Sequence, residues 1–239
     1  HTRSVGVTGV RRVLFRSIVV ALQTEFDLVK NIFTSFKEVE NRHITFFKGD
    51  ISGKEVALMK CGIGKVNAAV RLSELINVFA PDMVVNTGVA GGIDTEVNVG
   101  DVVVGRQCCY HDVWCGEGAW GQMQGLPLYF DGSRKILDIV ESLSLDNLHT
   151  GLICTGDQFI TEAIGLQTIK RNFPKALAVD MESAAMAHIC YQRNIPFASI
   201  RVVSDTPDKE TDNQTQYFDF WETAPKRTFD VLKKVLEKL

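Results

Sequence analysis

Short apolar runs alternate with segments of helical periodicity along this chain, and this alternation most constrains its fold. Mainly apolar runs of the length of a buried strand recur at residues 18–22, 83–87, 151–155, 176–179 and 197–203. Segments with apolar residues three and four apart lie between them, for example residues 66–79. No linker-like segment divides the pattern. The sequence therefore predicts one α/β domain with a central mixed, largely parallel sheet flanked by helices.

The first 17 residues do not follow this pattern. They include Arg3, Arg11, Arg12 and Arg16 and lack the uninterrupted apolar core of a secretory signal. A cloning or assembly remnant, a disordered arm and a replaced first strand all fit this composition. We therefore expect an atypical N-terminal extension at residues 1–17, non-native or disordered, before a domain at residues 18–239.

Composition excludes several classes of function. The net charge of −3 leaves no basic footprint for nucleic acid, and no apolar run approaches the ~20 residues of a membrane span. The six cysteines form no Cys-x-x-Cys pair, and the five histidines are scattered. We therefore expect reduced thiols in a cytoplasmic protein that binds no metal, membrane or nucleic acid.

Local signals set the expected boundaries of individual elements. Thr24 is the expected N-cap of a first helix, with Asp27 three residues on and apolar spacing that continues to Phe36. Residues 225–239 are expected to form an amphipathic C-terminal helix. Further strands are expected at residues 43–48, 55–60, 100–104 and 106–112.

Two carboxylates flank a methionine where an apolar run passes into a helix of small residues, at residues 178–185. Asp180 and Glu182 are costly there unless paired or used, because buried carboxylates are rare. The alternative is a helix start, where acids complement the positive helix end. Glu25 has the same two interpretations, since it falls in the first turn of a helix that leaves a strand.

Glycines and an aromatic residue follow two other strands. Residues 88–92 form a glycine cluster whose Val89, Ala90 and Gly91 are candidate substrate contacts, because glycine lets a ligand approach the backbone. A tight turn is the alternative. Phe159 and Ile160 follow the run at residues 151–155 in the same way.

The last apolar strand carries charge of both signs. Arg201 lies inside it and requires an anionic or strongly accepting partner, and Ser204 and Asp205 stand at its end. In open α/β sheets ligands bind beyond the carboxyl ends of the strands. We therefore expect these side chains to meet the other acids and glycines at one site.

This set of residues suits a polyol attached to a flat heterocycle. A carboxylate can hold vicinal hydroxyls, an aromatic ring can stack on a base, and an acid can protonate a leaving group. No metal-ligand cluster, serine elbow or dinucleotide motif accompanies the set, so no cofactor is expected.

Several motifs in fixed order carry a resemblance to a known family. The sequence resembles the bacterial 5′-methylthioadenosine/S-adenosylhomocysteine nucleosidases, within the purine nucleoside phosphorylase/uridine phosphorylase superfamily. The resemblance spans about residues 18–239 and implies a nucleoside phosphorylase-like fold. Its segments are residues 21–26, 61–66 (CGIGKV), 86–92 (NTGVAGG), 100–104, 110–112 (YHD), 156–160 (GDQFI), 179–182 (VDME) and 201–205 (RVVSD).

The resemblance implies hydrolysis of 5′-methylthioadenosine and S-adenosylhomocysteine, and 5′-deoxyadenosine is a further candidate substrate. Glu25 would activate the attacking water with help from Arg201, and Glu182 would bind the ribose hydroxyls. Asp205 would protonate the purine N7. The supporting contacts would come from Met181 against the sugar, Phe159 and the Ile160 backbone at adenine, and Ser204 beside Asp205.

The sequence departs from the family pattern at several positions. Val89 stands where many relatives have serine and cannot donate a hydroxyl hydrogen bond. Leu22 stands where methionine is common, and Asp180 replaces a frequent glutamate. Tyr217 falls where a phenylalanine caps the pocket. Arg16 and Ser17 stand at the expected start of the first strand.

Other functions remain open on the same residues. A nucleoside phosphorylase would need a phosphate site, which Val89 and the arginine-free residues 21–25 do not offer. A nucleosidase for another purine, such as futalosine, is a second alternative. A non-catalytic nucleoside-binding protein is the third, but binding alone needs no proton donor beside a base.

Residues 113–130 are aromatic and glycine-rich without clear periodicity. Such a segment is typical of a functional loop or a subunit contact. The family forms homodimers in which the partner helps close the 5′ side of the substrate, so this segment is the candidate contact. A mobile surface loop is the alternative.

Overall fold

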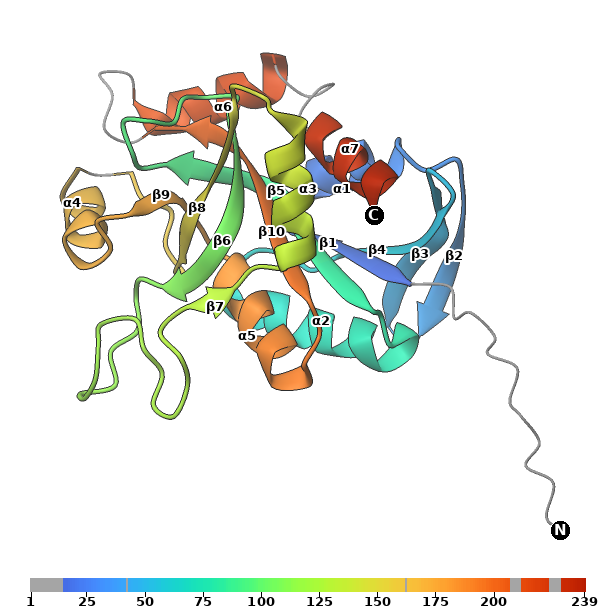
Figure 1. Ribbon diagram of the computed structural model, residues 1–239, viewed down its shortest axis with the longest axis horizontal. Helices are drawn as coiled ribbons and strands as arrows, with labels where there is room; N and C mark the ends of the chain where they lie inside the picture. Colours follow the sequence, from blue (N-terminus) through green and yellow to red (C-terminus); the bar gives the residue numbers. More distant parts are fainter. Residues whose placement is uncertain (1–14, 42, 162, 207–211, 224–228) are drawn as a thin grey trace, which may run out of the picture.

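The computed structural model describes residues 15–41, 43–161, 163–206, 212–223 and 229–239. Within these residues ten strands form one sheet, and helices cover both of its faces (Figure 1). In chain order the elements are β1 (Arg16–Val20), α1 (Gln23–Lys30), β2 (Ser35–Asn41), β3 (Ile44–Ile51), β4 (Lys54–Lys60), α2 (Lys65–Phe79), β5 (Met83–Gly92), β6 (Val102–Tyr110), β7 (Phe130–Asp131), α3 (Arg134–Leu143), β8 (Leu148–Thr155), α4 (Ala163–Asn172), β9 (Ala176–Asp180), α5 (Ser183–Arg193), β10 (Phe197–Asp205), α6 (Asn213–Thr223) and α7 (Asp230–Lys238).

The sheet has a closed part and an open part. β5 pairs in parallel with β1 and β10 and antiparallel with β9. β10 joins β6 antiparallel, and β6, β8 and β9 follow in parallel, so these strands close into a ring. From β1 the sheet continues through β4 to the antiparallel β3 and β2. The α/β class and the mixed sheet are confirmed, whereas the ring was not predicted.

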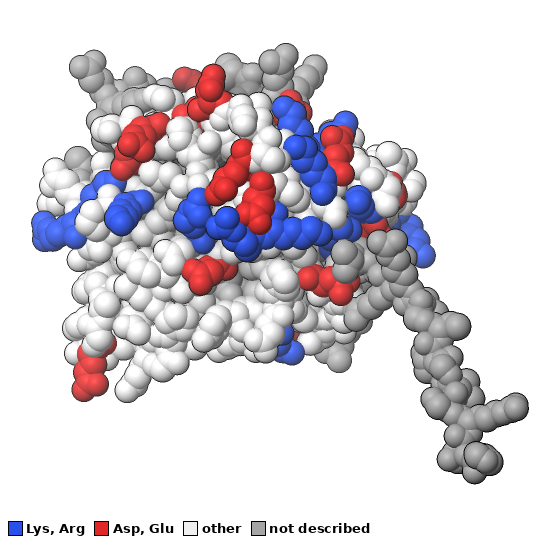
Figure 2. Space-filling view, in the orientation of Figure 1, with Lys and Arg blue, Asp and Glu red and all other residues white. Residues whose placement is uncertain are grey.

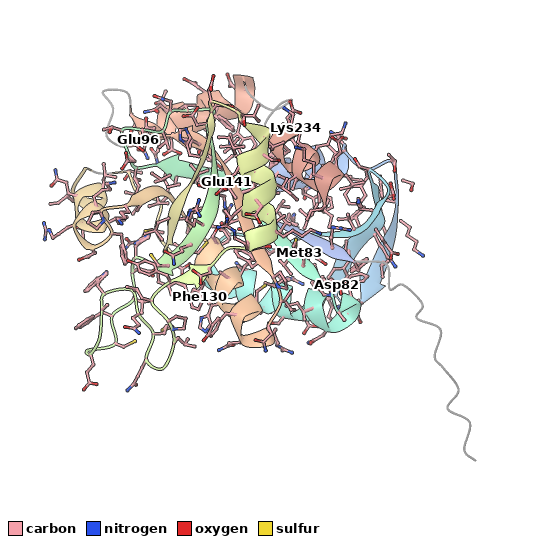
Figure 3. The ribbon with its side chains drawn as sticks, viewed as in Figure 1. Asp82, Met83, Glu96, Phe130, Glu141 and Lys234 are labelled. Atoms are coloured by element: carbon pink, nitrogen blue, oxygen red, sulfur yellow. The ribbon has the colours of Figure 1, made fainter. Side chains whose placement is uncertain are left out.

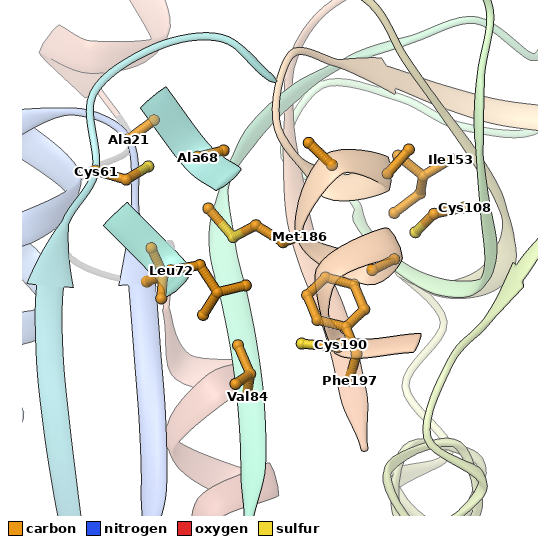
Figure 4. Packing of buried hydrophobic residues seen from close by; sticks show 14 of the residues in the cluster. Ala21, Cys61, Ala68, Leu72, Val84, Cys108, Ile153, Met186, Cys190 and Phe197 are labelled. Carbon is orange, nitrogen blue, oxygen red and sulfur yellow. The ribbon is translucent and has the colours of Figure 1, made fainter. Parts of the chain in front are cut away.

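Two layers of helices bury the faces of this sheet. α2 and α5 lie side by side on one face, and Met186 of α5 points toward Ala68 of α2 in the packing between them (Figure 4). α3 and α7 pack against the other face, where Leu232 and Leu236 are fully buried. The apolar spacing of these helices thus has its expected role, burial of one stripe.

The first strand begins two residues earlier than predicted. Arg16 and Ser17 belong to β1 and are buried, and β1 lies between β4 and β5 rather than at an edge. Burial lowers the pKa of Arg16, and the charge of Asp82 opposes that shift. Residues 1–14, where most of the expected extension falls, lie outside the described residues.

The first helix is shorter than its apolar spacing indicated. It ends at Lys30, and its N-cap is Leu22 rather than Thr24, so the N-cap prediction was wrong. Phe36 belongs to β2 and packs its ring on Phe47 of β3, with centroids 5.6 Å apart. The spacing to Phe36 therefore reflects packing on a sheet rather than a helix.

Three other boundaries differ from the predictions. Residues 102–110 form one strand, β6, whose register shifts near Gly105, where two strands had been predicted. Helix α6 had not been predicted. The C-terminal helix is described only from Asp230, because residues 224–228 lie outside the described residues.

Charged side chains of both signs mix on the face that bears α3 and α7 (Figure 2). Arg134 pairs with Asp138 at 2.8 Å, and Arg106 pairs with Glu141 at 3.0 Å. In Figure 2 the Lys and Arg side chains form a band across this face, and Asp and Glu side chains lie above and below the band. Among the described residues, no helix is both long enough and apolar enough to cross a membrane.

The amino end and the carboxyl end of β5 lie in different parts of the molecule. Asp82 and Met83 mark the amino end of β5, and Glu96 lies beyond its carboxyl end (Figure 3). β1, β5 and β10 are mutually parallel, so their carboxyl ends share one edge. The residues selected from the sequence lie at that edge.

Candidate active site

A cavity of about 340 Å³ lies at the carboxyl ends of β1, β5, β9 and β10. This volume falls within the roughly 300–1,000 Å³ of small-molecule sites. Nearly all of the predicted site residues line it: Glu25, Val89, Ala90, Gly91, Phe159, Ile160, Met181, Glu182, Ser204, Asp205 and Tyr217. Arg201 does not line the cavity and lies buried behind it.

Glu25 is held by backbone donors from two strand ends. Its Oε2 accepts hydrogen bonds from the Ala21 and Leu22 amides, both at 2.9 Å, and Oε1 accepts one from Val89 N at 3.0 Å. The side chain is 1% exposed. Burial raises the pKa of Glu25 above its usual value, although the Arg201 charge and the backbone N–H groups oppose that rise. The three hydrogen bonds thus hold the carboxyl in one orientation, and the raised pKa makes its ionised form a stronger base than an exposed glutamate.

Gly88 makes room for this arrangement. A Cβ at this position would collide with Glu25 Oε1 and with Arg201 Nη1. Glu25 Oε1 and Arg201 Nη1 therefore both occupy the space that a side chain at position 88 would enter. The glycine cluster serves close approach, and the approaching groups are the protein's own side chains.

Arg201 is paired with Asp180 rather than with Glu25. Its Nη2 lies 2.6 Å from Asp180 Oδ2 and also contacts Asn86 Oδ1, and both Arg201 and Asp180 are nearly inaccessible. Thr155 Oγ1 donates to Asp180 Oδ1 at 2.5 Å, and Ser183 donates to its other oxygen. Arg201 therefore influences Glu25 through its charge, not through a direct bond.

Glu182 is the second cavity carboxylate and forms the N-cap of α5. Its Oε1 accepts a hydrogen bond from Gly64 N at 2.9 Å, which ties the glycine loop of residues 62–64 to the cavity. Oε2 lies 3.6 Å from Arg201 Nη2. Burial raises the pKa of Glu182 to about 7, the Arg201 charge opposes the rise, and Asp180 adds to it.

Asp205 is the last residue of β10 and lines the same cavity. Ser204 Oγ donates to its Oδ1 at 2.7 Å, and Asn213 Nδ2 donates to its Oδ2 at 3.2 Å. Burial raises the pKa of Asp205, and these two hydrogen bonds oppose the rise. Within the described residues no ion pair involves Asp205, so no cation holds it in the ionised form.

Aromatic rings form a wall near Asp205. Phe159 is 46% exposed to the cavity and its surroundings, and its ring lies 5.7 Å from the Tyr217 ring in an edge-on arrangement. The Ile160 carbonyl accepts a hydrogen bond from Asn213 Nδ2 at 2.8 Å. A flat heterocycle can therefore stack on Phe159 while its edge faces the Asp205 carboxyl.

No metal site accompanies these groups, since no cluster of three His, Cys, Asp or Glu residues able to hold a metal ion occurs in the described part of the chain.

The segment at residues 113–129 contains neither helix nor strand. Trp114 and Trp120 stack there with their centroids 5.7 Å apart, and Trp120 Nε1 donates to the His111 carbonyl at 2.8 Å.

Sequence reasoning missed three kinds of site residue. Asn86 and Ser183 contact Arg201, but neither residue type signals a charge network by itself. Gly64 contributes a backbone amide, which a glycine motif only hints at. Asn213 had no signal, because the helix that carries it lacks clear periodicity.

Comparison with known proteins shows the family of this chain. Residues 16–237 match the model of the phosphorylase superfamily. A 5′-methylthioadenosine/S-adenosylhomocysteine nucleosidase of Staphylococcus carnosus is 37% identical over 227 residues, which cover 93% of this chain and 99% of that protein.

Solved structures show the same similarity. The nucleosidase of that name from S. pneumoniae, in complex with the transition-state inhibitor MT-ImmA, superposes with a TM-score of 0.88 at 32% identity, over 94% of this chain and 99% of that one. The enzyme from Colwellia psychrerythraea, in complex with adenine, gives 0.86 at 34% identity, over 95% and 96%. The chain therefore belongs to the phosphorylase superfamily and, within it, to the family of the 5′-methylthioadenosine/S-adenosylhomocysteine nucleosidases.

Proposed function

We propose that the chain hydrolyses the N-glycosidic bond of 5′-methylthioadenosine and S-adenosylhomocysteine, releasing adenine and the 5-substituted ribose. The observation that carries the proposal is the division of one cavity between two kinds of carboxyl group. Glu25 and Glu182 lie within the field of Arg201, whereas Asp205 faces only neutral donors. The S. pneumoniae relative in complex with a transition-state inhibitor and the Colwellia psychrerythraea relative in complex with adenine support an adenine nucleoside as the ligand.

The Glu25 end supplies the nucleophile. Glu25 takes a proton from a water molecule, and the water oxygen forms a bond to C1′ of the ribose. The raised pKa of Glu25 brings the carboxylate closer to the basicity that water activation needs. Glu182, with Met181 beside it, binds the ribose hydroxyls, and Arg201 holds the network through Asp180.

The Asp205 end receives the leaving group. The C1′–N9 bond breaks, its electron pair passes to the purine, and Asp205 gives its proton to N7, so that neutral adenine leaves. The raised pKa of Asp205 favours its protonated form more than in an exposed carboxyl. Phe159 stacks on the base, and Tyr217 closes the same wall.

Adenine release in phosphate-free buffer tests this proposal. We expect full turnover without phosphate and no stimulation by it, because Val89 offers no hydroxyl at the glycine cluster. Strict dependence on phosphate would overturn hydrolysis in favour of phosphorolysis. Tight nucleoside binding without adenine release would instead indicate a non-catalytic binding protein. The same assay over 5′-methylthioadenosine, S-adenosylhomocysteine and 5′-deoxyadenosine ranks the substrates.

We also infer that two copies of the chain associate through the apolar surface formed by Ile63, Val66, Val70, Trp114 and Trp120. Each of these side chains is exposed, from 39% for Trp120 to 71% for Val66. The Lys65–Asp112 ion pair at 2.6 Å brings the tryptophan segment to the start of α2, so the residues share one region. Such surfaces mark protein contacts.

The association is tested by light scattering of the wild-type protein and of Val66→Lys. We expect a dimer that this substitution weakens, whereas Val99→Lys, which alters another exposed valine, is the matched control. A monomer with full activity would remove the proposal.

The buried cysteines are free thiols, which supports the further proposal of a cytoplasmic location.

A further inference from the structure

Asn213 is the first residue of α6, and it lies at the Asp205 end of the cavity, where the proposed function places the purine base (the base end). Its Nδ2 donates to Ile160 O at 2.8 Å and to Asp205 Oδ2 at 3.2 Å. The side chain is 2% exposed. One amide group therefore connects α6 with the end of β10 and with the segment that carries Phe159.

The two acceptors fix the orientation of this amide. The Ile160 carbonyl can only accept hydrogen bonds, and an ionised Asp205 carboxylate can also only accept them. The amide nitrogen must face both, because the reverse orientation would place Asn213 Oδ1 against another oxygen. Oδ1 is then buried without a hydrogen-bond partner among the described residues. Such an acceptor is unfavourable for stability, so the gain from this residue lies on its nitrogen side.

The contact matters because the charge of Asp205 changes during the proposed reaction. The carboxyl becomes negative when it gives its proton to the purine, and preorganised donors stabilise charge that develops at such a moment. Ser204 and Asn213 are the two donors in place. The Ser204 hydroxyl can rotate and accept a hydrogen bond, whereas the Asn213 Nδ2 amino group can only donate.

The other charged groups near Asp205 are already engaged. Arg201, on the same strand, pairs with Asp180. Glu25 and Glu182 line the same cavity from α1 and from the start of α5, and Tyr217 is the titratable group that faces Asp205 from α6. Asn213 and Ser204 are therefore the groups that directly modulate the Asp205 proton.

We propose that Asn213 is a positioning residue for the proposed reaction, whose amide orients the Asp205 carboxyl and the Ile160 carbonyl toward the purine and stabilises Asp205 once its proton has left. This inference rests on the proposed function for its kinetic consequences. Its structural content is independent, since the hydrogen bonds exist without a substrate. It also explains how α6, which lines the cavity with Gln214, Tyr217 and Phe218, is aligned with the acid.

Asn213→Ala tests the proposal through kinetics and pH dependence. We expect kcat to fall by about 10–100-fold, the effect of losing one hydrogen bond to a charged group, with a smaller change in KM. Removing a donor to the ionised form raises the pKa of Asp205. Asp205 then stays protonated to higher pH, so the alkaline limb of the kcat profile moves upward. Asn213→Ser keeps a residue suited to a helix start but has no amide to donate to Asp205, and it should show the same shift if the alanine variant folds poorly.

Gln216→Ala is the matched control. Gln216 also anchors α6, through hydrogen bonds with Thr206 at 3.0–3.3 Å, and none of these bonds involves Asp205. We expect this variant to retain the wild-type alkaline limb. An unshifted limb in both Asn213 variants, or an equal shift in Gln216→Ala, would overturn the positioning role.

The ¹³C resonance of the Asp205 carboxyl gives a readout without turnover. Its titration should move upward in Asn213→Ala and stay unchanged in Gln216→Ala. A wild-type protein that releases no adenine would defeat the proposed function, whereas an unchanged Asp205 titration in the Asn213 variants would defeat this inference alone.

Discussion

The end of the cavity to which we assign the ribose, the sugar end, contains Glu25 and Glu182, and both lie in the field of the buried Arg201 guanidinium. At the base end, to which we assign the purine, Asp205 accepts hydrogen bonds from the neutral donors Ser204 and Asn213. Burial raises the pKa of all three carboxyls. The cation opposes that rise at the sugar end, and only uncharged hydrogen bonds oppose it at the base end. One cavity thus contains two carboxyl environments, one beside a buried cation and one with neutral donors only.

The two ends also differ in how they are built. The sugar end rests on β1, β5, β9 and β10, whose backbone amides and buried side chains fix Glu25 and Arg201. The base end depends on α6 and the segment after β8, which meet at Asn213. We therefore expect substitutions at the sugar end to affect folding and activity together, and those at the base end to affect activity alone.

Asp205→Asn should give the largest effect and should sharpen the comparison. The neutral side chain matches the shape of the protonated acid but has no proton to give, so kcat should fall by about 10²–10⁴-fold. Nucleoside binding and thermal stability should change little. Adenine release and calorimetric titration measure the two quantities, and an active Asn variant would contradict the acid assignment.

Arg201→Met should mainly reduce stability. It leaves Asp180 buried without its partner, and breaking such a pair costs about 3–5 kcal/mol of unfolding free energy. Urea unfolding measures the change. Arg106→Met removes an exposed partner of Glu141 and should cost at most about 1 kcal/mol. Equal costs in the two variants would show that the buried network does not stabilise the sugar end.

Phe159→Ala should weaken base binding without moving the pH profile. Stacking of a base on an aromatic ring contributes roughly 1–3 kcal/mol, so KM should rise by about 10–100-fold. Asp205 and its donors are untouched by the change. Steady-state kinetics across pH measures both quantities. A shifted alkaline limb would mean that the ring also controls the Asp205 proton.

Glu182 gives the smallest expected effect, a pH dependence of stability in the ligand-free protein. Its pKa is about 7 in the folded state against a usual 4.5, so its contribution to stability is full below about 4.5 and is lost as pH rises through 7. Wild type should therefore lose about 5 °C in Tm relative to Glu182→Gln between pH 4.5 and 8, as for ~1–2 kcal/mol in a chain of this size. Parallel melting curves would contradict the raised pKa.

Local sequence signals predicted the elements best where one face of a regular element is buried. The strands near residues 83–87 and 197–203 and the helix of residues 183–193 are present, because burial imposes a period that the sequence displays. β2 and α6 were missed. β2 is an exposed edge strand, and α6 has polar residues between its apolar ones, so neither shows a clear period.

The sequence by itself determined the α/β class, the position of the acids at strand ends and the family, because all three follow from residue patterns and motifs that are local in the chain. Only the tertiary structure decided that Arg201 binds Asp180, that β5, β6, β8, β9 and β10 close into a ring, and that Asn213 reaches Asp205. The physical reason is that strand register and side-chain pairing join residues far apart in the chain. No local pattern specifies which of several buried acids will pair with Arg201.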